Sequence, residues 1–153
     1  MANTQALSTT GFKVGLLLGL HAFGTTVARA GTTKDSFKMA LYLASGALGA
    51  GTAVYSATSE VSGTGYTAGG VAVTNATAPT SSGTTSFWTP SASVVFSTVT
   101  LTTAFDAALL YNDTTTNKDA IGVYTFGSQT VTAGNFTLTM PTNDATNGLV
   151  RIA

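Results

Sequence analysis

The C-terminal third of the chain constrains the fold most, because it is a series of short apolar runs separated by turn-forming residues. Each run is rich in β-branched or aromatic side chains, and Gly, Asn, Asp, Ser or Pro lies between the runs, which cover residues 98–101, 107–111, 121–126, 135–140 and 148–152. Several runs alternate apolar residues with threonine, as a strand with one buried face does. This third predicts a β-meander or one half of a β-sandwich.

Similar strand patterns occur earlier in the chain. The clearest covers residues 37–43, where Phe37, Met39, Leu41 and Leu43 alternate on one side. Shorter runs cover residues 71–74, 85–88 and 94–96, with a weak strand or turn at 53–55. About seven or eight short strands at close spacing are typical of an antiparallel β-sandwich or jelly roll. No alternation of strands with helices is visible, which disfavours a doubly wound parallel sheet.

One helix is predicted near the N-terminus, over residues 10 to about 23. Apolar side chains recur there every three or four residues, at Phe12, Leu16, Leu20 and Phe23. A hydroxyl residue within 8–10 is the expected N-cap and Gly24 the expected stop. Gly15 and Gly19 weaken such a helix by roughly 1 kcal/mol each. We expect the apolar stripe to bind either the sheet or a neighbouring subunit, which makes these four residues the candidate partner-binding site.

The chain of 153 residues fits one domain. Residues 1–9 are small and polar and are predicted to form an N-terminal arm that becomes ordered only against a partner. Residues 10–153 then form a single mainly β domain with its N-terminal helix. A secretory signal is an alternative interpretation of Lys13, the apolar run 14–23 and Ala28-Arg29-Ala30. Two features disfavour a secretory signal: polar residues precede Lys13, and His21 interrupts the apolar run. The run is also too short to span a bilayer.

Charge is scarce and balanced. Charged residues make up 8% of the chain, with six basic and six acidic side chains and a formal net charge of +0. The sequence contains no basic patch of the kind that binds nucleic acid. A near-neutral surface of Thr, Ser, Ala and Gly suits a protein that packs against many copies of a partner, although an ordinary soluble domain is an equal alternative. The absence of cysteine excludes disulfides and thiolate chemistry, and one histidine cannot form a multi-histidine metal site.

Two motifs have a catalytic or binding alternative. His21 would need a nucleophile and an orienting carboxylate such as Asp35 to act in catalysis. A structural histidine in a core or interface is the favoured interpretation. The glycine-dense stretch 60–70 lacks the Lys-Ser/Thr pair of a phosphate-binding loop. It is instead predicted to be a structured loop that needs positive φ or close backbone approach, with Glu60 accepting hydrogen bonds from its amides.

Two further groups of residues also have a binding alternative. Residues 112–119 hold several oxygen ligands, but clusters of Asn and Asp more often mark hairpin turns than calcium sites. The rings of Phe87, Trp88 and Phe96 would need to be exposed to form a carbohydrate platform, and core packing is the commoner role. No catalytic residue, metal site or cofactor is predicted.

The sequence resembles a family of small structural proteins of tailed bacteriophages, from about residue 10 onward. The resemblance lies in residues 12–23 followed by 37–42, in the glycine-dense stretch 60–71, and in residues 107–112, 123–127 and 147–153. It implies a virion component without enzymatic activity, present in many copies and assembled in the host bacterial cytoplasm. Its expected partners are the major capsid protein or other virion proteins and further copies of itself, with no nucleic acid and no membrane.

The resemblance does not specify the position on the particle. We expect a capsid cement or decoration protein, because a flat uncharged surface and a polar arm suit bridging between capsid subunits. A neck or tail component is the main alternative, and a host-glycan-binding module comes third.

Overall fold

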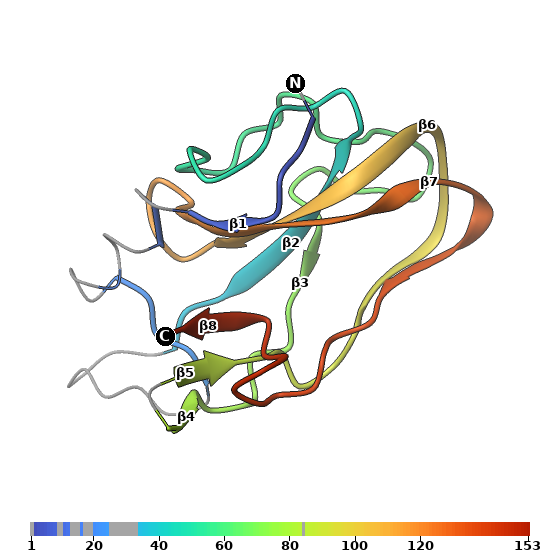
Figure 1. The fold of residues 1–153 in the computed structure, drawn as a ribbon. Coiled ribbons are helices and arrows are strands. Elements are labelled where there is room, and N and C mark those ends of the chain that lie inside the picture. The colour runs from blue at the N-terminus through green and yellow to red at the C-terminus, as the bar shows by residue number, and fades with distance from the viewer. Residues whose placement is uncertain (1, 9–10, 13–15, 17–19, 25–33, 84) are drawn as a thin grey trace.

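A computed structural model describes residues 2–8, 11–12, 16, 20–24, 34–83 and 85–153. The described chain forms two antiparallel sheets (Figure 1). A five-stranded sheet has the order β1-β7-β6-β2-β3, and a three-stranded sheet has the order β4-β5-β8. The strands are β1 (Ala6–Leu7), β2 (Phe37–Leu43), β3 (Val71–Ala72), β4 (Thr80–Ser82), β5 (Thr85–Trp88), β6 (Val94–Asn112), β7 (Ala120–Leu138) and β8 (Val150–Ile152). The predicted mainly β, antiparallel class is confirmed.

The dominant element is the hairpin of β6 and β7, each 19 residues long. The sequence predicted several short strands here, and this was wrong, because the residues taken for breaks are absorbed as irregularities in the pairing. The register shifts repeatedly between Phe96 and Phe105. Thr98 and Ala133 adopt positive φ angles of 51° and 48° in this region. The hairpin therefore bends without ending, and its outer half curves down toward the small sheet (Figure 1).

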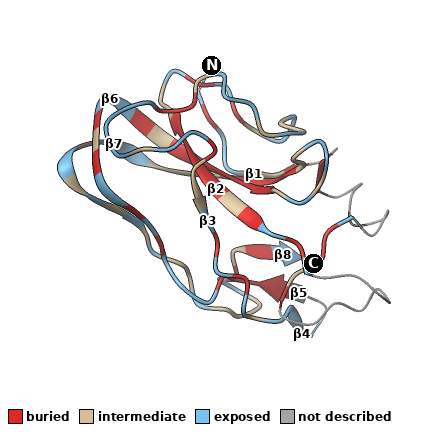
Figure 2. Cartoon of the chain, turned by 180° about the vertical axis from the view of Figure 1, so that it is seen from behind, coloured by how far each residue is buried: buried red, intermediate tan, exposed pale blue. Residues whose placement is uncertain are grey.

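Strand β2 lies at the centre of the molecule, and both of its faces are buried. Phe37, Met39 and Leu41 belong to the main hydrophobic core. Ala40 and Tyr42 point to the opposite face and join a second, smaller core. Figure 2 shows buried residues along β2 and exposed ones at the outer bend of the hairpin. The second core exists because the residues between β2 and β3 fold back over that face, as Leu48 and Tyr55 show.

The small sheet closes the main core. Phe87 and Trp88 of β5 and Val150 of β8 are buried, and both Trp88 and Val150 belong to the same core as β2. The Trp88 indole nitrogen also donates to Thr77 O at 2.9 Å. The two sheets thus share one apolar interior.

The predicted N-terminal helix is not supported. Residues 10, 13–15 and 17–19 of that range lie outside the described residues, and of the others only 11–12 and 16 have a helical backbone, so no helix over residues 10–23 is described. Residues 20–23 have no regular structure, so a helix does not reach Phe23. Ala22 N instead donates to the Asp35 carboxylate at 2.9 Å, a contact with a distant segment that replaces a helical hydrogen bond. At residues 20–23 this tertiary contact outweighs the local helical pattern.

The N-terminal arm also differs from expectation. Residues Ala6 and Leu7 form β1 and pair with Val123 and Gly122 at the edge of the large sheet. Asn3 and Ser8 are buried. The arm therefore finds its contacts on its own chain, and the prediction that it needs a partner to become ordered is not supported.

Candidate functional site

The four residues predicted to bind a partner lie in different environments. Phe12 is fully buried, and its ring lies 5.9 Å from that of Phe23. Phe23 in turn stacks on Phe37, with ring centres 4.9 Å apart. Leu16 is partly buried against the same core, whereas Leu20 is 38% exposed. The structure thus brings Phe12, Leu16 and Phe23 onto the chain's own core, and the partner-binding role of the four stays a prediction.

His21 belongs to a buried polar cluster that ties three segments together. Its Nδ1 lies 3.2 Å from Asn112 Nδ2, and its Nε2 lies 3.3 Å from Gly11 O. Asn112 Nδ2 also donates to Asp35 Oδ2 at 2.8 Å. Asp35, which the sequence named as the possible catalytic partner, is therefore nearby. Its Oδ2, however, accepts hydrogen bonds from the backbone and from an amide, which is the geometry of a cluster that holds chain segments in place.

Glu60 organises the glycine-dense loop, as predicted. Its Oε1 accepts hydrogen bonds from Gly69 N at 2.8 Å and from the Tyr66 hydroxyl at 2.7 Å. Its Oε2 accepts one from the Tyr55 hydroxyl at 2.7 Å. Gly65, Gly69 and Gly70 have positive φ angles. These contacts match the predicted structured loop, and three donors engage the Glu60 carboxylate.

Burial in the folded chain suppresses ionisation of all five tyrosines. Burial, followed by the hydrogen bond to Glu60, raises the pKa of Tyr55 to about 12. Burial also raises the pKa of each of the other four tyrosines well above the usual value of 10, namely Tyr42, Tyr66, Tyr111 and Tyr124. At alkaline pH the folded chain therefore keeps its phenol protons, whereas the unfolded chain releases them.

This arrangement predicts a delayed alkaline titration. At about pH 10.5 the folded protein should show little phenolate absorbance, while the chain unfolded in guanidinium chloride should be mostly ionised. The free energy of unfolding should not change through these groups below about pH 10. It should fall as the pH rises from there through the folded pKa values. An ultraviolet pH titration with circular dichroism in parallel measures both. A phenolate midpoint near 10 in protein that still has its native dichroism would contradict the packing of these rings.

The tip at residues 112–119 is held by ion pairs. Asp113 accepts from Lys38 and Lys118, each at 3.0 Å. Burial opposes ionisation of Asp113, but the two lysines outweigh it and hold the pKa of this carboxyl below its usual range. The Asn112 side chain turns inward to His21 and Asp35. The Asp113 carboxylate is thus already neutralised by lysines, which favours the hairpin-turn interpretation over a calcium site.

The aromatic residues considered for a carbohydrate platform lie in the interior. Phe87, Trp88 and Phe96 are each less than a tenth exposed. Phe96 stacks on Tyr66 with ring centres 5.8 Å apart. The core-packing interpretation is confirmed for these three rings.

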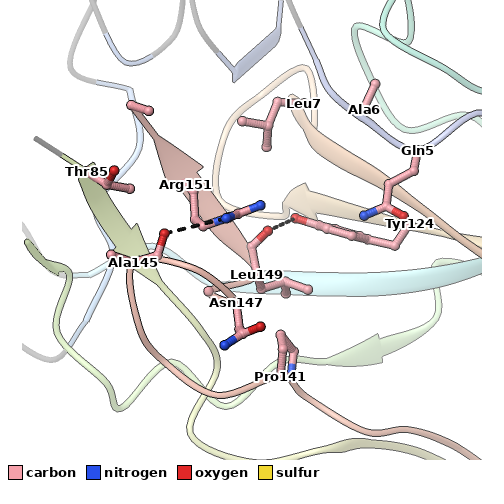
Figure 3. Close-up of a pocket in the computed structure, with 12 residues that line it drawn as sticks. Gln5, Ala6, Leu7, Thr85, Tyr124, Pro141, Ala145, Asn147, Leu149 and Arg151 are labelled. Atoms are coloured by element: carbon pink, nitrogen blue, oxygen red, sulfur yellow. Dashed lines mark hydrogen bonds between the residues drawn. The ribbon is translucent and has the colours of Figure 1, made fainter. Parts of the chain in front are cut away.

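Two open grooves lie side by side where β7 faces the small sheet. The first, of about 580 Å³, is lined by β1, by β8 and by residues 141–149 (Figure 3). The second, of about 490 Å³, follows β7 from Tyr124 to Leu138. Tyr124 and Leu149 line both grooves, and the Tyr124 hydroxyl donates to Leu149 O at 3.1 Å. Arg151 lines the first groove and donates to Ala145 O and Thr146 O, so backbone carbonyls already engage its guanidinium.

Sequence reasoning missed the residues that fasten the arm. Asn3 Nδ2 donates to Asp106 Oδ1 at 2.7 Å and to Leu43 O at 3.2 Å. Ser8 Oγ donates to Thr52 O at 2.6 Å. A lone aspartate within an apolar strand was the available signal for Asp106, because such a carboxylate needs a partner.

The described residues contain no cluster of metal-ligating side chains and no helix long and apolar enough to cross a membrane. No family model, no curated protein and no solved structure matches the chain.

Proposed function

We propose that this chain is a non-enzymatic structural protein of a bacteriophage virion, a capsid cement or decoration protein that binds the lattice of the major capsid protein. It would act as a jelly-roll-like β-sandwich, bound to the particle in many copies after assembly in the host bacterial cytoplasm. The resemblance described above supports this role, as does the character of the exposed surface. No cofactor, nucleic acid or membrane enters the proposal.

The observation that carries the proposal is the uncharged surface of the β6–β7 hairpin. Asp106 is the single charged residue of these two long strands, and Asn3 binds its carboxylate. Ser, Thr, Gln and Gly are exposed at the outer bend, and Val95, near the start of β6, is 41% exposed. Such a surface offers hydroxyl groups and peptide edges to a partner, and it imposes no like-charge repulsion between crowded copies.

A neck or tail component remains the second candidate, because the same surface suits any crowded protein assembly. Copy number separates the two, since a capsid lattice holds hundreds of sites and a neck or tail ring only a few. Quantitative mass spectrometry of purified particles gives this number. A host-glycan module is the weakest candidate, since the three rings that suggested it are buried.

The proposed attachment predicts retention in salt and release in urea. The cations described by the structure are already engaged: Lys38 and Lys118 by Asp113, Lys34 by Asn75 O and Arg151 by backbone carbonyls. Surface ion pairs contribute only about 0–1 kcal/mol and are screened by salt. We therefore expect the protein to stay on particles in molar sodium chloride and to leave in mild urea, which solvates apolar and peptide groups. The measurement is the fraction retained after sedimentation of particles.

A pair of variants locates the contact surface. Val95→Lys places a charge on the exposed face of the hairpin and should lower retention. Thr58→Lys adds the same charge to an exposed site in the loop between β2 and β3 and should leave retention unchanged.

Release of the unmodified protein by salt alone, from particles that stay intact, would show that charged side chains carry the attachment.

A further inference from the structure

The edge of β7 that faces away from β6 has no neighbouring strand over most of its length, among the residues that the structure describes. β1 pairs there only with Gly122 and Val123, near the beginning of β7 (Figure 1). An edge strand presents unpaired N–H and C=O groups, which proteins usually protect by keeping the edge short or by placing Lys or Pro on it. The edge strands β1, β3, β4 and β8 have two or three residues each. Residues 124–138 of β7 instead form a long edge without proline or a charged side chain.

The last part of this edge is regular and alternates apolar with polar side chains. From Phe136 to Leu138 the pairing of β7 with β6 continues without a register shift. Phe136, Leu138 and, just beyond the strand, Met140 are partly buried and line the second groove. The polar residues that alternate with them are exposed, namely Asn135, Thr137 and Thr139. One face of this segment is therefore apolar, the other carries hydroxyl and amide groups, and no charged residue lines the groove beside it.

We propose that this protein forms a two-fold dimer in which the β7 edges of two copies pair antiparallel, centred on Thr137. In that register Phe136 faces Leu138 of the second copy and Thr137 faces Thr137, so apolar side chains meet apolar ones and polar meet polar. A two-fold contact brings identical surfaces together, and this edge suits it because it carries no charge that would face its own copy. β1 already pairs antiparallel with the same edge. Pairing satisfies the free backbone groups and covers the apolar groove in both copies.

Opposite charges at the centre of the contact test the dimer in the full-length chain. Its dissociation constant is measured by sedimentation velocity over a range of concentrations, at low ionic strength, where charges are least screened. Thr137→Lys and Thr137→Glu each place like charges opposite one another, and each should raise the dissociation constant by about fivefold or more. An equimolar mixture of the two variants should restore it to within about twofold, because Lys then faces Glu. Native mass spectrometry with one variant isotope-labelled identifies the mixed dimer.

Thr130→Lys is the matched control, because Thr130 is an exposed residue of the same strand outside the proposed contact. It should leave the dissociation constant unchanged, and circular dichroism checks that every variant folds. An unmodified chain that stays monomeric up to about 1 mM overturns the proposal and leaves the edge free for a strand of another protein. A mixture that does not restore the dimer, or an equal effect of Thr130→Lys, overturns it as well. Each failure leaves the proposed attachment to a capsid lattice intact, since that is measured by retention on particles.

Discussion

Gly70→Ala should prevent this protein from folding stably. Gly70 has a φ of 72°, and a Cβ there would lie 1.9 Å from Met39 O and 2.7 Å from Ala40 Cα. Both contacts are with the backbone of the central strand, so no side chain can rotate away to relieve them. The left-handed conformation costs about 1–2 kcal/mol for a residue with a side chain. With the clash added, we expect a loss above about 4 kcal/mol, a large part of the stability of an ordinary domain.

Gly83→Ala is the matched control. Gly83 also has a positive φ, of 58°, but no atom lies within 4 Å of its Cβ position. It should lose only about 1–2 kcal/mol, the cost of the conformation alone. Urea denaturation followed by circular dichroism compares the two variants with the unmodified protein. Equal losses at the two positions would show that the glycine-dense loop does not lie against β2 as described.

Phe105→Ala should have the second largest effect. Phe105 is fully buried at the bend of the hairpin, where its ring contacts those of Phe136 at 4.9 Å and Phe126 at 6.0 Å. Removing a buried phenylalanine side chain costs about 3–5 kcal/mol, from lost burial and from the cavity left behind. Phe136 and Phe126 lie on the other strand of the hairpin, so the loss should also loosen the outer half of β6 and β7. Amide hydrogen exchange of residues 94–104 reports this local effect.

Val95→Ala provides the comparison on the same strand. Val95 lies on the exposed face of β6, and its truncation should change the free energy of unfolding by less than about 0.5 kcal/mol. A similar small effect at Phe105 would mean that the hairpin does not close over an aromatic core.

The candidate site could be predicted only where its contacts are local in sequence. The stretch 60–70 shows in its glycines that the backbone must turn tightly, and Glu60 reaches Gly69 within the same loop. The cluster of His21, Asp35 and Asn112 joins residues up to 91 positions apart. No spacing rule reveals such a cluster. Asn112 therefore looked like a turn residue, although it is fully buried and central to the cluster.

By itself, the sequence determined the fold class, the strands β2 and β5, and the burial of the large rings. These follow from the alternation of side chains along a strand and from the free energy of burying apolar area, which act residue by residue. Only the tertiary structure decided that the C-terminal runs merge into one bent hairpin, that residues 20–23 are not helical and that the arm becomes β1. Each of these outcomes depends on which distant partner satisfies a backbone group, such as Asp35 for Ala22 N and Ile121 O for Ser8 N. A local pattern shows that a backbone group needs a partner, but only the folded chain supplies one.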